Sequence, residues 1–520
     1  MAPSTRYTIR VALIVALGGF LMGFDASVIS GVVTFIEPEF KLTNIELGWA
    51  VASLTLTATL AMMVAGPLSD RFGRRPVLKV AAVLFTISAA ASAVAPDYIT
   101  LVAARMLGGL GVGAALIIAP MYIAEIAPAD IRGRMVSFNQ LNIVIGISAA
   151  FFSNYLILSL GQSDLAWAQS LNLAEWNWRW MLGVEALPAI FYFFALFSVP
   201  ESPRWLVMHN KDEDALEVMA QVTNRAQAEA ELKEVRASLD AEAHQEQASI
   251  RELFQPAMKL VLTIGISVAI LQQITGINSV FFYAPMIFEQ SGIGTDASFM
   301  QAVLVGLVNL VFTVLAIAMI DRLGRRPLLG FGLAGITICM LLLSYSFGQA
   351  TYTLTNDVIL ALPQEINTEA LLPLVNQTFD SDIAFSEAVS AAIGNDVYKA
   401  QQSAIVSGSI AMNPTLILIG ILGFVASFAI SLGPVMWVLF SELFPNRVRG
   451  IAISFVGLIN SAVSFTVQLV FPWELDNLGN SLTFLIYGAF AFIGLIVVMR
   501  LLPETKGKSL EELEAELVRR

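Results

Sequence analysis

The 520-residue chain has little charge: Asp, Glu, Lys and Arg make up only 13% of it, while 57% is hydrophobic. A soluble protein of this length needs far more polar surface than this composition supplies. The net charge of −12 gives no support for nucleic-acid binding. A single cysteine, Cys339, excludes an internal disulfide, and we interpret it as a small packing residue.

The sequence also lacks the residue clusters that a catalytic centre requires. It has only two histidines, and no Walker sequence, metal-ligand spacing or nucleophile triad is found. The glycines of Gly109-Leu110-Gly111-Val112-Gly113 resemble a nucleotide-binding loop. They lie inside a hydrophobic run with no strand before it, so close helix packing explains them better. We therefore expect no enzyme, no metal site and no cofactor.

Long hydrophobic runs are what the chain has in abundance. Twelve of them are long enough to cross a hydrocarbon core of roughly 30 Å. They lie near residues 9–36, 45–69, 77–95, 98–121, 135–160, 178–199, 258–291, 298–320, 327–348, 413–443, 448–472 and 480–502. We therefore predict an all-α membrane protein with twelve transmembrane helices, the first of which is retained and is not a signal peptide.

The basic residues are distributed unequally between the two sides of the predicted membrane. If the N-terminus is cytoplasmic, the outer loops contain only Lys41, Arg179 and Lys399, and Arg105 lies inside a hydrophobic run. The remaining Lys and Arg residues are then cytoplasmic. This asymmetry follows the positive-inside rule, so we expect both termini in the cytoplasm.

A heptapeptide occurs twice. Asp70-Arg71-Phe72-Gly73-Arg74-Arg75-Pro76 recurs as Asp321-Arg322-Leu323-Gly324-Arg325-Arg326-Pro327. The repeat predicts two six-helix halves related by duplication. We expect an N-terminal half at 1–199, a cytoplasmic helical linker at 200–257, a C-terminal half at 258–502 and a cytoplasmic tail at 503–520.

The second half contains an insertion at 349–412, which the predicted orientation places outside the membrane. It carries seven acidic residues and one basic residue, Lys399. A lid or a partner-binding segment is one interpretation. We favour a solvated and loosely packed segment, because such acidic stretches bury little apolar surface.

The repeated turns present arginines at the cytoplasmic surface, where later helices end in glutamates. Guanidinium–carboxylate pairs between helices would hold the inner side closed and would break when it opens. The alternative is that these charges only set the topology and contact lipid headgroups. The residues assigned to this cytoplasmic gate are Asp70, Arg74, Arg75, Glu125, Arg132, Asp321, Arg325, Arg326, Glu442 and Arg449.

Together with these turns, two further sequences resemble the sugar porter family of the major facilitator superfamily. They are Pro200-Glu201-Ser202-Pro203-Arg204-Trp205-Leu206 and Pro503-Glu504-Thr505-Lys506-Gly507. The resemblance covers nearly the whole chain apart from the insertion, and within the family the chain resembles bacterial proton-coupled xylose and hexose symporters. It implies a transporter in the lipid bilayer that works by alternating access. We expect a monomer in a plasma membrane, with a bacterial inner membrane favoured.

Three ionisable side chains lie inside the predicted spans: Asp25, Arg105 and Glu185. Charge is costly there, so each is a functional candidate. At 1.5 Å per residue, Asp25 and Arg105 lie at the same depth and are predicted to pair. Protonation of Asp25 would release Arg105 and couple a proton to the conformational change; a static pair that only fixes packing is the alternative. The resemblance favours coupling, because proton-coupled sugar porters carry Asp at this position. Glu185 is a weaker candidate, which could instead pair with cytoplasmic arginines or a helix end.

A sugar needs hydrogen-bond donors, acceptors and an apolar face, which amide and aromatic side chains supply. Any one amide could serve only to hold helices together, but the set matches the positions where sugar porters bind substrate. The assigned residues are Phe24, Gln140, Gln272, Gln273, Asn278, Tyr283, Asn309, Trp437 and Asn460. Sugar porters often have two tyrosines where this chain has Phe282-Tyr283, so the sugar stays open and a polyol also fits. Pro434 predicts a break in the tenth run.

The leading prediction is a proton-coupled monosaccharide symporter. A facilitative uniporter, with a structural Asp25, is the first alternative. A non-transporting sugar sensor on the same fold is the second. Such sensors usually have a long cytoplasmic tail, whereas only 18 residues follow the last hydrophobic run.

Overall fold

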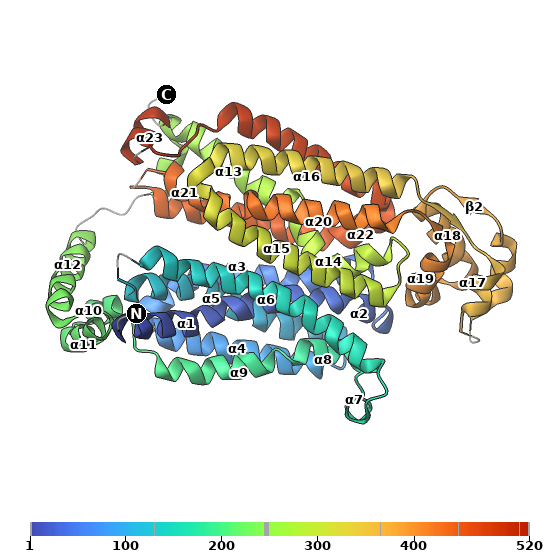
Figure 1. Cartoon of the computed structure of the whole chain (residues 1–520), viewed down its shortest axis with the longest axis horizontal. Coiled ribbons are helices and arrows are strands. Elements are labelled where there is room, and N and C mark those ends of the chain that lie inside the picture. Colours follow the sequence, from blue (N-terminus) through green and yellow to red (C-terminus); the bar gives the residue numbers. More distant parts are fainter. Residues whose placement is uncertain are drawn as a thin grey trace. The chain divides into compact units, whose positions relative to one another are not determined.

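The computed structural model describes residues 3–128, 131–243, 249–363, 366–445, 447–508 and 510–517. Nearly all of this chain is helical (Figure 1). It divides into two compact units. Unit 1 comprises Met1–Val28, Ser53–Ala150 and Arg179–Gln247, and unit 2 comprises Ile29–Ala52, Phe151–Trp178 and Ala248–Arg520. Two segments of the first half of the sequence therefore pack with unit 2.

Unit 1 consists of long hydrophobic helices followed by shorter helices in the predicted linker. Helices α3 and α6 lie mainly in unit 1 and extend into unit 2. The elements are α1 (Pro3–Val28), α3 (Asn44–Phe72), α4 (Arg74–Ala93), α5 (Tyr98–Ile126), α6 (Arg132–Gly161), α8 (Asn177–Gly183), α9 (Ala186–Ala195), η2 (Leu196–Ser198), α10 (Pro203–Met208), α11 (Asp212–Val222) and α12 (Arg225–Ala243).

Unit 2 contains the remaining helices and a small sheet. Its elements are η1 (Ile29–Gly31), α2 (Val33–Glu39), α7 (Ala166–Ser170), η3 (Ile250–Phe254), η4 (Pro256–Met258), α13 (Lys259–Ile274), α14 (Ile277–Glu289), α15 (Thr295–Leu323), α16 (Arg325–Gly348), β1 (Thr351–Thr353), α17 (Asn356–Ala361), η5 (Thr368–Leu374), β2 (Thr378–Phe379), α18 (Asp382–Ile393), α19 (Asn395–Ser409), β3 (Ile410–Ala411), α20 (Pro414–Ile430), α21 (Leu432–Leu443), α22 (Arg449–Leu501) and α23 (Leu510–Leu517).

Within the described residues, 11 helical stretches are long and apolar enough to span a membrane. The last of them, α22, has 53 residues, which is more than twice the roughly 20 residues that one helix needs to cross a hydrocarbon core. Gly479 interrupts α22 with a φ of +78°, so this helix contains both of the last two predicted runs. Each of the twelve predicted runs is therefore helical.

Two of the predicted runs are broken near their middle. Between α13 and α14, Gly276 has a φ of +94°, a conformation that favours glycine. Between α20 and α21, the break lies at Ser431, three residues before Pro434. This proline lies in the first turn of α21, where the missing N–H costs no helical hydrogen bond. The predicted break in the tenth run is confirmed, with Ser431 as its position.

The insertion at 349–412 is folded, so the prediction of a loosely packed segment was wrong. Strand β1 pairs antiparallel with both β2 and β3, and helices α17 to α19 lie beside this sheet (Figure 1, light orange). Buried apolar side chains form a core of its own, in which the rings of Tyr352 and Phe385 stack with centroids 5.2 Å apart.

The acidic residues of the insertion have a structural explanation. Asp357, Glu369, Asp382 and Asp396 each lie in the first turn of a helix, where a negative charge is favoured by the helix dipole. These acids mark helix starts and not disorder, which the sequence interpretation overlooked. Glu365 lies outside the described residues.

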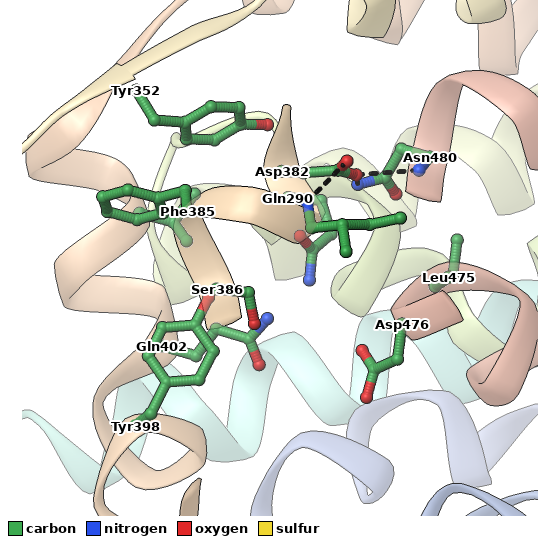
Figure 2. A pocket seen from close by; sticks show the side chains of 12 residues that line it. Gln290, Tyr352, Asp382, Phe385, Ser386, Tyr398, Gln402, Leu475, Asp476 and Asn480 are labelled. Atoms are coloured by element: carbon green, nitrogen blue, oxygen red, sulfur yellow. Dashed lines mark hydrogen bonds between the residues drawn. The ribbon is translucent and has the colours of Figure 1, made fainter. Parts of the chain in front are cut away.

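Buried polar contacts anchor the insertion within unit 2. The Lys399 ammonium of α19 lies 3.3 Å from Glu37 of α2 and 2.8 Å from Asp476 of α22. Burial alone would lower the pKa of Lys399, but the two carboxylates outweigh it and hold the pKa above its ordinary value. Asp382 accepts hydrogen bonds of 2.8 Å from the backbone and side-chain N–H groups of Asn480 (Figure 2). The insertion is thus tied to α2 and to the break in α22.

Candidate functional site

A buried group of charges lies in unit 1. Arg105 of α5 donates to the side chain and to the backbone carbonyl of Asp25 of α1, each at 3.4 Å. The predicted pair is therefore present. The contact is longer than the 2.7–2.9 Å of a strong charge-assisted hydrogen bond. Asp25 Oδ2 and Arg105 Nε have no hydrogen-bond partner among the described residues, so the pair leaves bonding capacity unused.

Glu185 belongs to the same group. It precedes α9, is only 2% exposed, and its charge acts on both Asp25 and Arg105. The cation whose charge acts on Glu185 is Arg105, and the Glu185 side chain makes no cap bond to α9 among the described residues. Its Oε1 also lacks a partner among the described residues. The carboxylates of Asp25 and Glu185 therefore both attract the Arg105 guanidinium, which contacts Asp25.

An amide network lies in unit 2 and joins α13, α14 and α22. Asn460 donates to the side-chain oxygen of Gln272 at 2.8 Å and to the backbone carbonyl of Ala269 at 2.9 Å. Gln273 donates to Asn460 at 3.3 Å and accepts from Asn278 at 2.8 Å. Four of the predicted sugar-binding amides are thus in one hydrogen-bonded group.

The network includes two residues that the sequence analysis missed. Asn278 donates to the Ser464 hydroxyl at 2.7 Å, and Gln468 donates to the same hydroxyl at 2.8 Å. Ser464 and Gln468 both lie on α22, one helical turn apart, and Ser464 follows Asn460 by four residues. Polar side chains at a spacing of four on one helix face were the available signal. The hydroxyl of Tyr283 donates to the backbone carbonyl of Gln468 at 2.9 Å. This predicted residue therefore contacts the network at Gln468.

The other predicted sugar-binding residues are more dispersed. Asn309 of α15 is buried, and Trp437 of α21 is 49% exposed with its ring against Phe440. Phe24 is buried beside Asp25, and Gln140 is exposed on α6. Phe24 and Gln140 belong to unit 1, whereas Asn309 and Trp437 belong to unit 2.

The first repeated turn forms a network of ion pairs within unit 1. Arg74 makes two parallel hydrogen bonds to Glu125, of 3.0 and 2.8 Å, and a third of 2.7 Å to Asp70. The turn before it needs Gly73, whose φ is +106°. Arg74 is only 3% exposed, so this bidentate contact satisfies a buried cation.

The second repeated turn reproduces this geometry within unit 2. Arg325 makes hydrogen bonds of 3.1 and 2.6 Å to Glu442, and Asp321 lies 3.2 Å from its guanidinium. Gly324 has a φ of +93°. The duplication seen in the sequence is thus repeated at the level of side-chain contacts.

A further carboxylate completes each turn, and it was not among the predicted gate residues. Glu201 accepts from the backbone N–H groups of Arg74 and Arg75, and Glu504 accepts from those of Arg325 and Arg326. The hydroxyls that follow, of Ser202 and Thr505, donate to Glu125 and Glu442 respectively. Burial raises the pKa of Glu201, although the backbone donors oppose this effect. The Pro-Glu-Ser and Pro-Glu-Thr sequences were the signal for these contacts.

The remaining gate residues have other contacts. Arg75 and Arg326 each donate to a backbone carbonyl, of Phe197 at 3.5 Å and of Met499 at 2.6 Å. Arg449 donates to the carbonyl of Phe444 at 3.2 Å. Arg132 is exposed at the start of α6, and its positive charge favours the ionised carboxylate of Glu231 in the linker.

Comparison with known proteins gives concordant matches over nearly the whole chain. A profile of the family described as sugar (and other) transporter matches residues 11–362 and 388–517. The arabinose-proton symporter of Bacillus subtilis is 32% identical, over 98% of this chain and 95% of that protein. The D-xylose-proton symporter of Escherichia coli is 34% identical, over 98% and 96% respectively. An inward-open structure of the xylose transporter XylE from E. coli aligns with a TM-score of 0.74 at 31% identity, over 98% of this chain and 100% of that one.

Proposed function

Since the chain belongs to the sugar transporter family of the major facilitator type, we propose that it carries a monosaccharide across the membrane together with a proton. The fold is that of a twelve-helix transporter in two six-helix halves. Relatives whose names include proton symport of arabinose and of xylose support this activity. The observation that carries it in this chain is the buried group of Asp25, Arg105 and Glu185.

The charge of that group supports proton coupling. Counting the described residues, Asp25 and Glu185 contribute two negative charges and Arg105 one positive charge. An uncompensated charge buried in a low-dielectric environment is costly. Uptake of one proton makes the group neutral, so the group favours binding of a single proton.

The loose Asp25–Arg105 contact makes this proton useful for transport. Protonation of Asp25 weakens its attraction for Arg105, and the guanidinium can then pair with Glu185, whose Oε1 has no partner among the described residues. Because Asp25 is on α1 and Glu185 precedes α9, this exchange changes which helices the arginine joins. A proton thereby shifts the equilibrium between two arrangements of unit 1.

The amide network is proposed as the main part of the sugar site. Gln272, Gln273, Asn278 and Asn460 present donors and acceptors without charge, which suits a ring of hydroxyls. Their mutual hydrogen bonds fix the side chains before the sugar arrives, so little conformational entropy is lost on binding. Asn309, Tyr283 and Trp437 of the same unit complete the proposed set, and Phe24 and Gln140 of unit 1 stay predictions.

The repeated turns are proposed as the cytoplasmic gate, with both termini on that side. Each turn links its Arg to carboxylates of its own unit. We propose that the two six-helix halves, 1–199 and 258–502, move about the sugar site, with 200–257 as their linker. The protein is proposed to act as a monomer in the lipid bilayer of a bacterial inner membrane.

The proposal is tested with purified protein in proteoliposomes and radiolabelled xylose, arabinose and glucose. An inward proton gradient is expected to drive accumulation of at least one sugar above its external concentration. Equilibration without accumulation, at every pH, would instead identify a facilitative uniporter. Binding of a sugar with no movement of it across the membrane would identify a sensor.

A further inference from the structure

A polar cavity lies in unit 2, away from the amide network. It has a volume of about 190 Å³ and is enclosed by α2, the end of α14, the start of α15 and α19. Its polar lining includes Glu37, Glu289, Gln290, Lys399, Gln402 and Ser403. None of these residues belongs to the proposed sugar site, the charge group of unit 1 or the repeated turns, so the functions assigned so far leave this cavity unexplained.

Two oxygen atoms at this cavity lack partners. Glu289 is 8% exposed, and its Oε1 has no hydrogen-bond partner among the described residues. The Thr34 hydroxyl also lacks one among these residues. A buried carboxylate oxygen accepts but cannot donate, so leaving it unpaired is costly. The cavity therefore calls for a group that donates hydrogen bonds.

The charges around the cavity restrict what it binds. The lining carboxylates are Glu37 and Glu289, and the lining ammonium is that of Lys399. This ammonium is already shared by Glu37 and Asp476. An anion would meet excess negative charge, and a cation would be repelled by Lys399 where it approaches Glu37. A neutral ligand with several hydroxyl groups avoids both costs.

The size and the remaining side chains fit a single sugar ring. A cavity of roughly 150 Å³ accommodates benzene, so about 190 Å³ accommodates a somewhat larger ring. The ring of Phe35 lines one side and offers an apolar surface. The amides of Gln290 and Gln402 supply both donors and acceptors.

A neighbouring cavity serves as a contrast. It lies between the insertion and α22, has a volume of about 20 Å³ and shares Gln290 and Gln402 with the larger one (Figure 2). That volume holds about one water molecule. Only the larger cavity of this pair therefore has the size of a sugar ligand.

Helix α14 connects the cavity to the proposed sugar site. Asn278 lies near the start of this helix and Glu289 is its last residue, so the two are about 16 Å apart along the axis at 1.5 Å per residue. Between them, Tyr283 departs from helical geometry and Pro285 follows it. In the proposed orientation, the end of α14 with Glu289 faces the outside.

We propose that this cavity is an outer binding site for a monosaccharide, formed by Glu289, Thr34 and Gln402 with the ring of Phe35. The sugar donates hydroxyl hydrogens to Glu289 Oε1 and Thr34 Oγ1 on its way to the amide network. The inference rests on the proposed function, because that function supplies the sugar and the direction of entry.

Equilibrium binding to the purified full-length protein tests the proposal. Radiolabelled D-xylose is titrated over a wide concentration range against the wild type, Glu289→Gln and Thr34→Val. Glu387→Gln is the control, because Glu387 is an exposed carboxylate of the insertion that does not line the cavity. Thermal unfolding of each variant establishes that it is folded, and Thr34→Val removes a hydroxyl that bonds nothing in the described structure.

The wild type and Glu387→Gln are expected to bind two sugars per chain, one tightly and one weakly. Glu289→Gln loses a charge-assisted hydrogen bond, so the weaker affinity falls by roughly tenfold or more while the tighter one is unchanged. Thr34→Val weakens the same phase by a smaller factor. One sugar per chain in the wild type, or a weak phase unaffected by both variants, overturns the outer site and leaves a water-filled cavity. If the wild type also shows no tight binding of D-xylose, and arabinose and glucose do not bind either, the proposed function itself fails.

Discussion

Gly108 of α5 provides the space that the carboxylate of Asp25 occupies. A Cβ atom at position 108 would lie 2.6 Å from Asp25 Oδ2 and 2.5 Å from the Ser88 hydroxyl. Such distances are far shorter than any van der Waals contact, so a side chain here must displace Asp25 or Ser88. The position of the proposed proton-binding carboxylate therefore depends on a glycine three residues after Arg105.

Gly108→Ala is predicted to impair proton coupling. The added methyl group pushes Asp25 away from Arg105, and overpacking of this kind costs about 1–3 kcal/mol. Gradient-driven sugar uptake in proteoliposomes is expected to fall by roughly tenfold. Gly66→Ala is the matched control, because a Cβ at Gly66 of α3 meets no atom within 4 Å. Equal effects of the two changes would show that Gly108 has no special relation to Asp25.

The amide network is predicted to bind the sugar. Gln272→Ala removes the acceptor of the 2.8 Å hydrogen bond from Asn460 and one group that would contact the sugar. The dissociation constant for the transported sugar, measured by equilibrium dialysis, is expected to rise roughly tenfold or more. Asn356→Ala, an exposed amide of α17, should leave it unchanged. An unaltered affinity of Gln272→Ala would place the sugar elsewhere.

The repeated turns are predicted to depend on their glutamates. Glu125→Gln leaves the buried Arg74 with a weaker bidentate partner, so the free energy of unfolding is expected to decrease by about 2 kcal/mol. Glu442→Gln should cost less, because Glu442 is 20% exposed where Glu125 is 11% exposed. Thermal unfolding of both variants measures their loss of stability, and their uptake rates measure the effect on transport.

A comparison with Arg71 separates the gate from a purely topological role. Arg71 is exposed, with its guanidinium 5.2 Å from the centre of the Phe72 ring. If the arginines only set the topology and contact lipid, Arg71→Gln and Arg74→Gln should be equivalent. The gate predicts that Arg74→Gln lowers transport strongly while Arg71→Gln has little effect.

Lys399 is predicted to hold the insertion in place. Lys399→Met leaves the Glu37 and Asp476 carboxylates without their shared cation, and breaking a buried pair of this kind costs about 3 kcal/mol. The exposed pair of Lys41 and Asp396 is the control, and Lys41→Met should change the melting temperature little. Similar melting temperatures of Lys399→Met and wild type would contradict the anchoring role.

The sign of the pH dependence follows from the raised pKa of Lys399. A cation with a raised folded-state pKa contributes its full stability below its unfolded pKa of about 10.4, and loses it only as the pH rises through the folded value. The stability difference between wild type and Lys399→Met is therefore expected to persist up to about pH 9 and to diminish only above the unfolded pKa of about 10.4.

Regular helix geometry explains which parts of the site were predictable. A constant rise per residue was enough to predict that Asp25 and Arg105 lie at one depth, and the hydrophobic runs predicted the spans. The recruitment of Glu185 depends on how distant segments pack, which no local pattern encodes. The contacts of Glu201 and Glu504 were signalled only by the recurrence of Pro-Glu-Ser as Pro-Glu-Thr. The folded insertion was missed because its acidic helix starts, such as Asp382, were taken as a sign of loose packing.

The measurement that tests the central claim most directly compares two kinds of transport by Asp25→Asn. Asparagine keeps the size of the side chain but cannot bind the proton, so the pair with Arg105 is lost at every pH. The account predicts that the wild type accumulates sugar when an inward proton gradient is imposed. It predicts that Asp25→Asn exchanges labelled for unlabelled sugar at a comparable rate but accumulates none. Gradient-driven accumulation by Asp25→Asn equal to that of the wild type would contradict the account.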